Sequence, residues 1–309
     1  MEIFLVFLGL LVSLVLGANN ASTCFGTSVG FTRYLEAASL AVLGVLMGVI
    51  LEGEKLSKAV SGGVLEEPIL GGKPLLIVMI SVLILMVIAT LLYLPLPVSE
   101  GFIGSAIGLG LATEIGVNWI FTLRIFTFWI LTPFFSAFLA VLIYKIVSWI
   151  TYLAKDILTI NYLYSKITLA LSFYVAYVFG ANTIGLISGI YRHLLGMTGF
   201  ILFGSFTGLG MYLLGRGVTE SVGKNIISLS PSTALVAQLS GALIVHIFTQ
   251  ICLPVSVTQA IIGGVLGVGL AKKIVILNKR VVKSIIAGWA VAPLFGLVIS
   301  YLLAIITLF

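Results

Sequence analysis

The sequence predicts an all-α polytopic membrane protein made of two inverted-topology repeats with broken, re-entrant helices. Three observations predict this fold class. Hydrophobic residues make up 61% of the 309 residues and charged residues only 8%, whereas a soluble domain has about 25% charged residues. Apolar runs such as 75–94 and 234–253 reach the roughly 20 residues that cross a bilayer. Short motifs of the first half return, in the same order, in the second half.

The apolar runs predict eight helices, near 2–17, 35–52, 75–94, 118–146, 167–180, 196–214, 233–253 and 284–309. Four segments between them are too short to cross a membrane and are rich in Gly, Ser, Thr and Asn, namely 19–31, 99–112, 182–191 and 256–271. Non-helical backbone inside a membrane must be buried in protein or line an aqueous cavity. Short interrupted segments at matched places in two halves therefore predict a transport site.

The duplication extends through the whole chain. The matched motifs are Gly17-Ala18-Asn19 with Gly180-Ala181-Asn182, Pro97-Val98-Ser99 with Pro254-Val255-Ser256, Gly108-Leu109-Gly110-Leu111-Ala112 with Gly267-Val268-Gly269-Leu270-Ala271, and Trp129 and Pro133 with Trp289 and Pro293. We therefore expect a first transmembrane repeat over 1–145, a cytoplasmic linker over 146–166 and a second transmembrane repeat over 167–309. In a membrane chain, such a duplication is typical of a transporter whose site lies between the halves.

The basic residues predict how the repeats are oriented. The loop 272–283 is rich in lysine and arginine, whereas its counterpart in the first half, 113–118, contains Glu114 and no basic residue. Because basic loops stay in the cytoplasm, we expect the linker and 272–283 inside the cell and the Glu114 loop outside. Different charge in matched loops indicates that the two repeats have inverted orientations.

Several other classes of protein are disfavoured. The net charge of +6 comes from scattered bases rather than from a basic stripe that would bind nucleic acid. Cys24 and Cys252 lie in apolar contexts without metal-ligand or disulfide spacing. The apolar segments contain no catalytic triad or zinc-protease motif, so neither an enzyme nor a resident cofactor is expected. A channel built from the same broken helices is an alternative that flux measurements would reveal.

Polar residues that could contact a ligand gather in the short segments. In the first and third segments the candidates are Asn19, Asn20, Thr27, Ser28, Asn182, Thr183 and Ser188. Glycines beside them let backbone approach a ligand closely, and a half-helix beginning there would direct free N–H groups and its positive dipole end at an anion. The alternative is a helix crossing at the glycines, with the polar side chains hydrogen bonded across it.

In the second and fourth segments the candidates are Ser99, Ser256, Thr258 and Gln259. A proline precedes each group, and proline ends the preceding helix because it lacks an N–H. Serine is a good N-cap for the helix that follows. The helix end, the hydroxyl and the new helix N-terminus together would form a cradle for an oxyanion. The alternative is a simple helix break capped by serine.

Together these motifs resemble the inorganic phosphate transporter family, which includes related sulfate permeases, over almost the whole chain. The residues that match the family's patterns are Gly17, Ala18, Asn19, Phe25, Gly26, Thr27, Ser28, Val29, Gly30, Pro97, Val98, Ser99, Gly180, Ala181, Asn182, Gly189, Pro254, Val255, Ser256 and Thr258. The resemblance implies a secondary transporter that carries an inorganic oxyanion by alternating access through a site near the bilayer midplane. Phosphate is the expected substrate, and sulfate is the alternative.

The chain departs from the family pattern at charged positions. The motif aspartates are replaced by Asn20 and Thr183, and the motif histidine by Gln259. In the family, those aspartates are suited to holding sodium ions beside the anion. Without them the coupling ion is open: neutral oxygens of Asn20 and Thr183 could hold a sodium ion, or protons could drive uptake. Proton-coupled sulfate transport is therefore the second hypothesis.

Glu100 is the further candidate for ion coupling because it follows Ser99 in an otherwise apolar stretch. A charged carboxylate at mid-membrane costs about 2.5–3.5 kcal/mol on insertion scales, which favours the protonated form of the group. A protonatable acid beside an anion site could couple proton and anion transport. The alternative places Glu100 at the membrane edge, in water.

Other polar residues are expected in supporting roles. Arg124 and Arg192 are predicted to anchor helix ends at the membrane interface, although arginine can also bind an oxyanion. His246 is predicted to form a hydrogen bond between helices. A short chain without large soluble loops predicts the cell membrane of a bacterium or an archaeon, with the lipid bilayer as its surroundings. The sequence leaves a homodimer open.

Overall fold

A computed structural model describes residues 1–57, 59, 63–69, 71–92, 96–225, 229–273 and 279–308. Eight helices in these ranges are long and apolar enough to cross a membrane. Their bounds are α1 (Glu2–Phe25), α2 (Tyr34–Glu52), α3 (Gly72–Leu91), α5 (Trp119–Leu153), α6 (Ile157–Phe179), α8 (Arg192–Leu213), α10 (Pro231–Gln250) and α12 (Lys279–Leu308). The predicted all-α membrane fold is confirmed.

Shorter helical elements connect or interrupt the long ones. They are η1 (Gly26–Ser28), η2 (Gly53–Leu56), α4 (Val98–Ala112), η3 (Gly180–Ile184), α7 (Gly185–Ile190), α9 (Arg216–Asn225) and α11 (Val257–Lys272). The predicted short helices near 99–112 and 256–271 are therefore confirmed as α4 and α11. Each follows a proline that cannot continue the preceding helix.

The other two expected short segments are not separate elements. Near 19–31, α1 continues without a break to Phe25 and is followed by the single 3₁₀ turn η1. Near 182–191, the chain continues from α6 through the π-helical turn η3 into α7. A π-turn inserts a residue into a helix and often marks a functional site. The predicted helix starts at these two places are wrong.

The linker between the halves is shorter than its predicted range of 146–166. Helix α5 extends to Leu153 and α6 begins at Ile157, so most of that range is helical. The Asp156 side chain caps α6 by accepting a hydrogen bond from Leu158 N at 2.9 Å. At the other end of α5, the Asn118 side chain accepts one from Phe121 N at 3.1 Å. These two caps satisfy N–H groups that a helix start leaves without partners.

Close backbone contacts at glycines repeat between the two halves of the chain. A Cβ atom at Gly104 of α4 would lie 2.1 Å from the carbonyl oxygen of Pro293, and one at Gly263 of α11 would lie 2.4 Å from that of Pro133. Only glycine allows helices to approach so closely. Each short helix therefore packs against the last long helix of the other half, α4 on α12 and α11 on α5.

Other helix pairs also correspond between the halves, some across the two halves and some within one half. Helix α2 packs on α6 as α8 packs on α1, and α3 packs on α4 as α10 packs on α11. At the first of these crossings a Cβ atom at Gly180 would lie 2.3 Å from Val45 O, and at the second a Cβ at Gly17 would lie 1.9 Å from Thr207 O. The duplicated motifs thus occupy equivalent places in a structure whose halves are interlocked.

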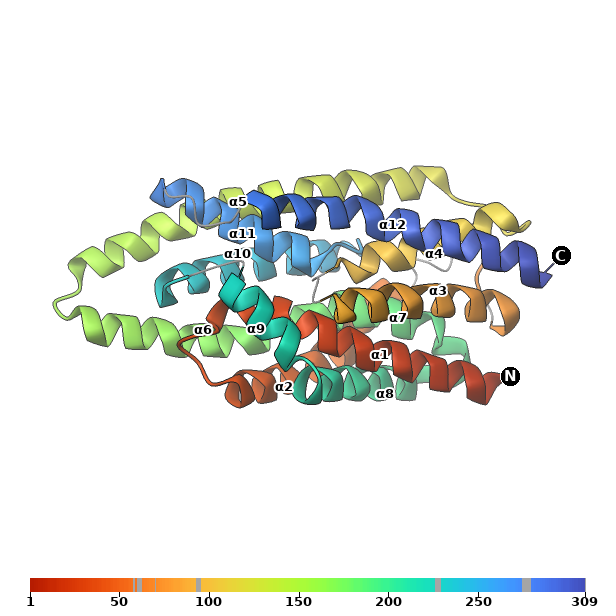
Figure 1. The fold of residues 1–309 in the computed structure, drawn as a ribbon, viewed down its shortest axis with the longest axis horizontal. Helices are drawn as coiled ribbons and strands as arrows, with labels where there is room; N and C mark the ends of the chain where they lie inside the picture. The colour runs from red at the N-terminus through yellow and green to blue at the C-terminus, as the bar shows by residue number, and fades with distance from the viewer. Residues whose placement is uncertain are drawn as a thin grey trace.

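Figure 1 shows an elongated bundle with both chain termini at one end and the α5–α6 turn at the opposite end. Large apolar side chains such as Ile120, Phe134 and Phe138 are exposed along α5. Apolar faces of this extent are covered by lipid in a membrane protein. The polar side chains described below lie inside the bundle instead.

Candidate functional site

The predicted site residues are all buried. None of the following is more than 5% exposed: Asn19, Asn20, Thr27, Ser28, Ser99, Glu100, Asn182, Thr183, Ser188, Ser256, Thr258 and Gln259. A polar group inside a membrane protein is costly unless it has a partner or faces a ligand. The hydrogen bonds of these residues therefore show which of them support the structure and which have polar atoms left for a ligand.

Side chains from the two halves meet at the end of α1. The hydroxyl groups of Thr23 and Thr258 lie 3.1 Å apart, which joins α1 to α11. Gln238 of α10 donates a hydrogen bond from Nε2 to Thr27 Oγ1 at 2.7 Å. We call this region, where α1, α4, η3, α10 and α11 bring polar residues of both halves together, the junction.

The junction includes two residues that the sequence analysis did not place in the site. Thr23 follows Asn19 by four residues, which is about one turn of a helix, and that spacing could have marked it. Gln238 carries no motif signal, because it lies in the middle of the apolar helix α10. Its Oε1 atom is buried and has no hydrogen-bond partner.

Asn182 fastens the connection between α10 and α11. Its Nδ2 donates to Thr249 Oγ1 at 2.9 Å and to Leu253 O at 3.2 Å, and its Oδ1 accepts from Val255 N at 3.2 Å. Both donor hydrogens of the amide are used in this way. In this conformation Asn182 positions the 251–255 segment rather than presenting a donor to a ligand.

The start of α11 matches the predicted serine cap. Ser256 is the N-cap residue, and its Oγ accepts a hydrogen bond from Gln259 N at 3.2 Å. From outside, α5 holds the same region through Trp129 Nε1, which donates to Pro254 O at 3.0 Å, and Ser136 Oγ, which donates to Ala260 O at 2.5 Å. The start of α11 is therefore rigidly supported.

The start of α4 differs from that prediction. Its N-cap residue is Pro97, and no side chain caps the helix. Ser99 is buried in the first turn and does not act as the N-cap, so that expectation is wrong. The first-turn N–H groups of α4 have no intrahelical acceptor. A helix start of this kind favours an anion through its N–H groups and its dipole.

Glu100 lies in the same first turn and is completely buried. The alternative that it sits in water at the membrane edge is therefore wrong. The Gln259 side chain of α11 lies close enough to interact with the carboxyl group. Even so, neither carboxylate oxygen nor Gln259 Oε1 has a partner with hydrogen-bond geometry. An unpaired buried carboxylate is unfavourable, so a proton or a cation bound there would stabilise the junction.

Several candidates make only local contacts. Asn20 Nδ2 donates to Leu16 O at 3.1 Å, and Ser28 Oγ donates to Phe25 O at 2.7 Å. Ser188 lies on α7, which packs on η2, and its buried hydroxyl has no hydrogen-bond partner. Over the described ranges, no hydrogen bond joins Ser188 to α4 or α11. It lies beside the junction rather than in it.

A second polar cluster joins three helices at the far end of α2 from η1. The Tyr174 hydroxyl lies 2.8 Å from His246 Nδ1, and Glu52 Oε2 lies 3.3 Å from His246 Nε2. Gln250 Nε2 donates to Glu52 Oε2 at 2.7 Å. The predicted interhelical hydrogen bond of His246 is confirmed. Glu52, the last residue of α2, links α2 to α10.

The sequence profile of the phosphate transporter family matches residues 16–304. The chain belongs to the phosphate transporter family. This family member is 33% identical over 292 residues to a Methanocaldococcus jannaschii protein provisionally named a phosphate permease, with 94% of this chain and 92% of that protein covered. It is 28% identical over 311 residues to the sulfate permease CysP of Bacillus subtilis, with 98% and 87% covered.

A solved structure titled the sodium-dependent phosphate transporter shares the fold of this family member. The TM-score is 0.89 at 20% sequence identity, and the match covers 99% of this chain and 98% of that chain. The fold and the membrane helices agree with the predicted multi-pass protein of the plasma membrane. The relatives come from both bacteria and archaea.

Proposed function

We propose that this protein is a secondary active transporter that carries phosphate through the junction by alternating access. The observation that carries the proposal is the junction itself, where polar residues from both halves are buried inside a bundle whose outer faces are apolar. Unpaired polar atoms at such a place favour a bound ligand over a purely structural role. Membership of the phosphate transporter family supports phosphate as the substrate.

Alternating access fits two repeats of inverted orientation. Helix α1 begins at the end of the bundle that contains the termini, whereas its counterpart α6 begins at the opposite end, after the α5–α6 turn (Figure 1). When two halves with opposite orientations in the membrane exchange conformations, the protein can adopt two similar states, one open to each side of the membrane. The difference in charge between the loops 113–118 and 272–283 supports the same orientation.

Within the junction, we assign different roles to α4 and α11. The uncapped N–H groups of α4, together with Ser99, Thr258 and the amide of Gln259, would bind the oxyanion. Glu100 would hold the coupling proton or cation beside it, because its carboxylate oxygens have no hydrogen-bond partner. Asn20 and Thr183 are the remaining candidates for a sodium ion, through neutral oxygens.

Uptake into proteoliposomes tests substrate and coupling together. Purified protein is reconstituted, and uptake of labelled phosphate and sulfate is measured with a sodium gradient, a proton gradient or neither. Saturable phosphate uptake driven by one of the gradients supports the proposal. Glu100→Gln is expected to remove the dependence on that gradient while leaving phosphate exchange without a gradient measurable. Gradient-driven uptake that is unchanged in Glu100→Gln would contradict the role of Glu100.

Proton-coupled sulfate transport is the second candidate function. Two observations favour it: both motif aspartates are replaced by neutral residues, and the sulfate permease CysP aligns with 98% of this chain. In the same assay, saturable sulfate uptake driven by protons, with little phosphate uptake, would select this candidate. Saturable uptake of neither anion would reject both.

A further inference from the structure

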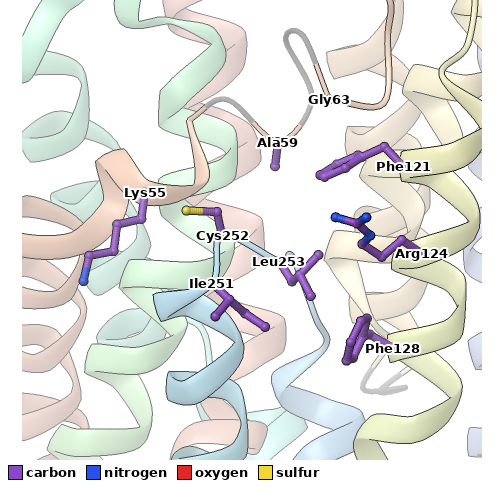
Figure 2. A pocket seen from close by; sticks show the side chains of 9 residues that line it. All are labelled: Lys55, Ala59, Gly63, Phe121, Arg124, Phe128, Ile251, Cys252 and Leu253. Carbon is purple, nitrogen blue, oxygen red and sulfur yellow. The ribbon is translucent and has the colours of Figure 1, made fainter.

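A pocket of about 490 Å³ lies between the start of α5 and the end of α10. Figure 2 shows the side chains that line it, which are Lys55, Ala59, Gly63, Phe121, Arg124, Phe128, Ile251, Cys252 and Leu253. Leu253 connects the pocket to the junction, because its carbonyl oxygen accepts a hydrogen bond from Asn182 at 3.2 Å. Thus one wall of the pocket is the segment that leads directly into the start of α11.

Among the described residues that line the pocket, two side chains are basic and none is acidic. Lys55 is turned toward other partners: its Nζ donates to Gln250 Oε1 at 2.5 Å and lies 3.5 Å from Glu52 Oε2. Glu52 therefore offsets the charge of Lys55 from outside the pocket. Of the two described bases, Arg124 therefore contributes its positive charge to the pocket interior.

Arg124 directs its guanidinium group into the pocket, between the rings of Phe121 and Phe128 and toward Cys252 and Leu253 (Figure 2). Among the described residues, Arg124 forms no ion pair within 4.0 Å, unlike Arg192, which is paired with Glu54. An arginine that only anchors a helix end would extend toward lipid headgroups. The orientation of Arg124 fits an anion receptor better than an interfacial anchor.

We propose that this pocket is a vestibule where the oxyanion is captured before it reaches the junction, and that Arg124 is the residue that binds it there. The inference rests on the proposed function, because the ligand is the transported oxyanion itself. A guanidinium group can donate two parallel hydrogen bonds to one oxyanion. A positive charge in a cleft with apolar walls also raises the local concentration of anions and their rate of association.

The chain contains a natural reporter of this charge. Cys252 is exposed and lines the pocket, whereas Cys24 is buried. Membrane-impermeant thiol reagents of methanethiosulfonate type, one anionic and one cationic, are applied to the full-length protein at low ionic strength. The ratio of the two rates of Cys252 modification measures the local potential. Cys252→Ser is expected to abolish the labelling, which confirms that Cys252 is the residue modified.

Arg124→Gln is expected to lower the ratio of anionic to cationic modification rates by about tenfold, and the difference should shrink at high salt. Inorganic phosphate or sulfate should slow modification of the wild-type protein and have less effect in the variant. The matched control is Arg33→Gln, because Arg33 is an exposed arginine paired with Glu36 and lies outside the pocket. That control should leave the ratio unchanged.

Transport kinetics give a second readout. Arg124→Gln should raise KM for the oxyanion about tenfold at low salt with little change in kcat, and Arg124→Lys should recover part of the loss. An unchanged rate ratio at Cys252 with intact protein would overturn the vestibule, whether or not uptake occurs. Absence of saturable oxyanion uptake by the wild type would overturn the proposed function instead, so the two failures are distinguishable.

Discussion

At the scale of single residues, the buried polar side chains of the junction fall into two groups. The Asn182 amide uses both donor hydrogens on the α10–α11 connection. The Glu100 carboxylate has no partner with hydrogen-bond geometry, although it is equally buried. Residues of the first kind fix the shape of the junction, and we propose that residues of the second kind contact the transported ions.

Asn182→Ala is expected to destabilise the protein by about 1–3 kcal/mol, because Val255 N–H and Leu253 O lose a buried partner. The change should appear as a lower Tm of the purified protein in detergent. Asn161→Ala is the matched control. Asn161 lies on α6, the helix that leads into η3, and its side chain is not part of the junction, so this change should leave Tm nearly unchanged. Equal Tm values for the two variants would show that the hydrogen bonds of Asn182 contribute nothing to stability.

Site residues could be predicted from the sequence only where they lie in or next to a repeated motif. The duplicated motifs identified polar residues that the structure buries, including Asn182 and Ser256. Gln238 was missed because one amide in an apolar helix carries no pattern of its own. The orientation of Arg124 could not be predicted, since a single arginine near a helix start has the same sequence signature whether it faces lipid or a pocket.

At the scale of elements, the breaks after prolines were predictable and the others were not. Proline removes an N–H, so α4 and α11 had to begin as separate helices near Val98 and Val257. The Gly-Ala-Asn motifs at 17–19 and 180–182 have the composition of helix breaks, but the helical backbone continues through both of them. Their glycines lie inside or directly after long helices and permit close helix crossings, so burial decides the conformation there.

Gly104→Ala tests the crossing of α4 and α12. Its Cβ would lie 2.1 Å from Pro293 O, so the two backbones must separate. Overpacking of this kind costs about 1–3 kcal/mol, and the loss should be visible as a reduced Tm. In Gly199→Ala, the control, the nearest atom to the added Cβ is Leu195 Cβ at 3.2 Å, so a shift of only a few tenths of an ångström is needed. If both variants melt at the same temperature, the proposed tight crossing is incorrect.

The cap of α6 predicts a pH dependence. Hydrogen bonds from the Thr159 hydroxyl and from Leu158 N–H lower the pKa of the Asp156 carboxyl below its usual 3.8. A lowered pKa in the folded state means that the stabilising effect of the cap is present above the unfolded value and is lost as pH falls through the folded value. Backbone amides at the start of α6 should therefore lose protection from exchange as pH falls below 3.8, the usual pKa of the carboxyl, and through its lowered folded-state pKa. Asp156→Asn should flatten this dependence. Identical pH profiles for wild type and variant would contradict it.

At the scale of the whole molecule, the account depends on two interlocked halves with polar residues at their junction. The exchange of partners, α4 with α12 and α11 with α5, means that neither half can move without changing contacts to the other. The duplication was predictable from recurring motifs, whereas the interlocking was not, because motif order carries no information about which half a short helix packs on. This arrangement suits a carrier whose two conformations exchange through the junction.

Counterflow across a reconstituted membrane tests the central claim most directly. Proteoliposomes are loaded with unlabelled phosphate and diluted into medium that contains a trace of labelled phosphate, without any ion gradient. An alternating-access carrier should accumulate labelled phosphate inside transiently above its equilibrium level. The excess unlabelled phosphate inside occupies the inward-facing site, returns it to the outward-facing conformation and so keeps the label from leaving. Sulfate in place of phosphate provides the matched test for the second candidate. Label that only equilibrates for both anions, without an overshoot, would indicate a channel and contradict transport by alternating access at the junction.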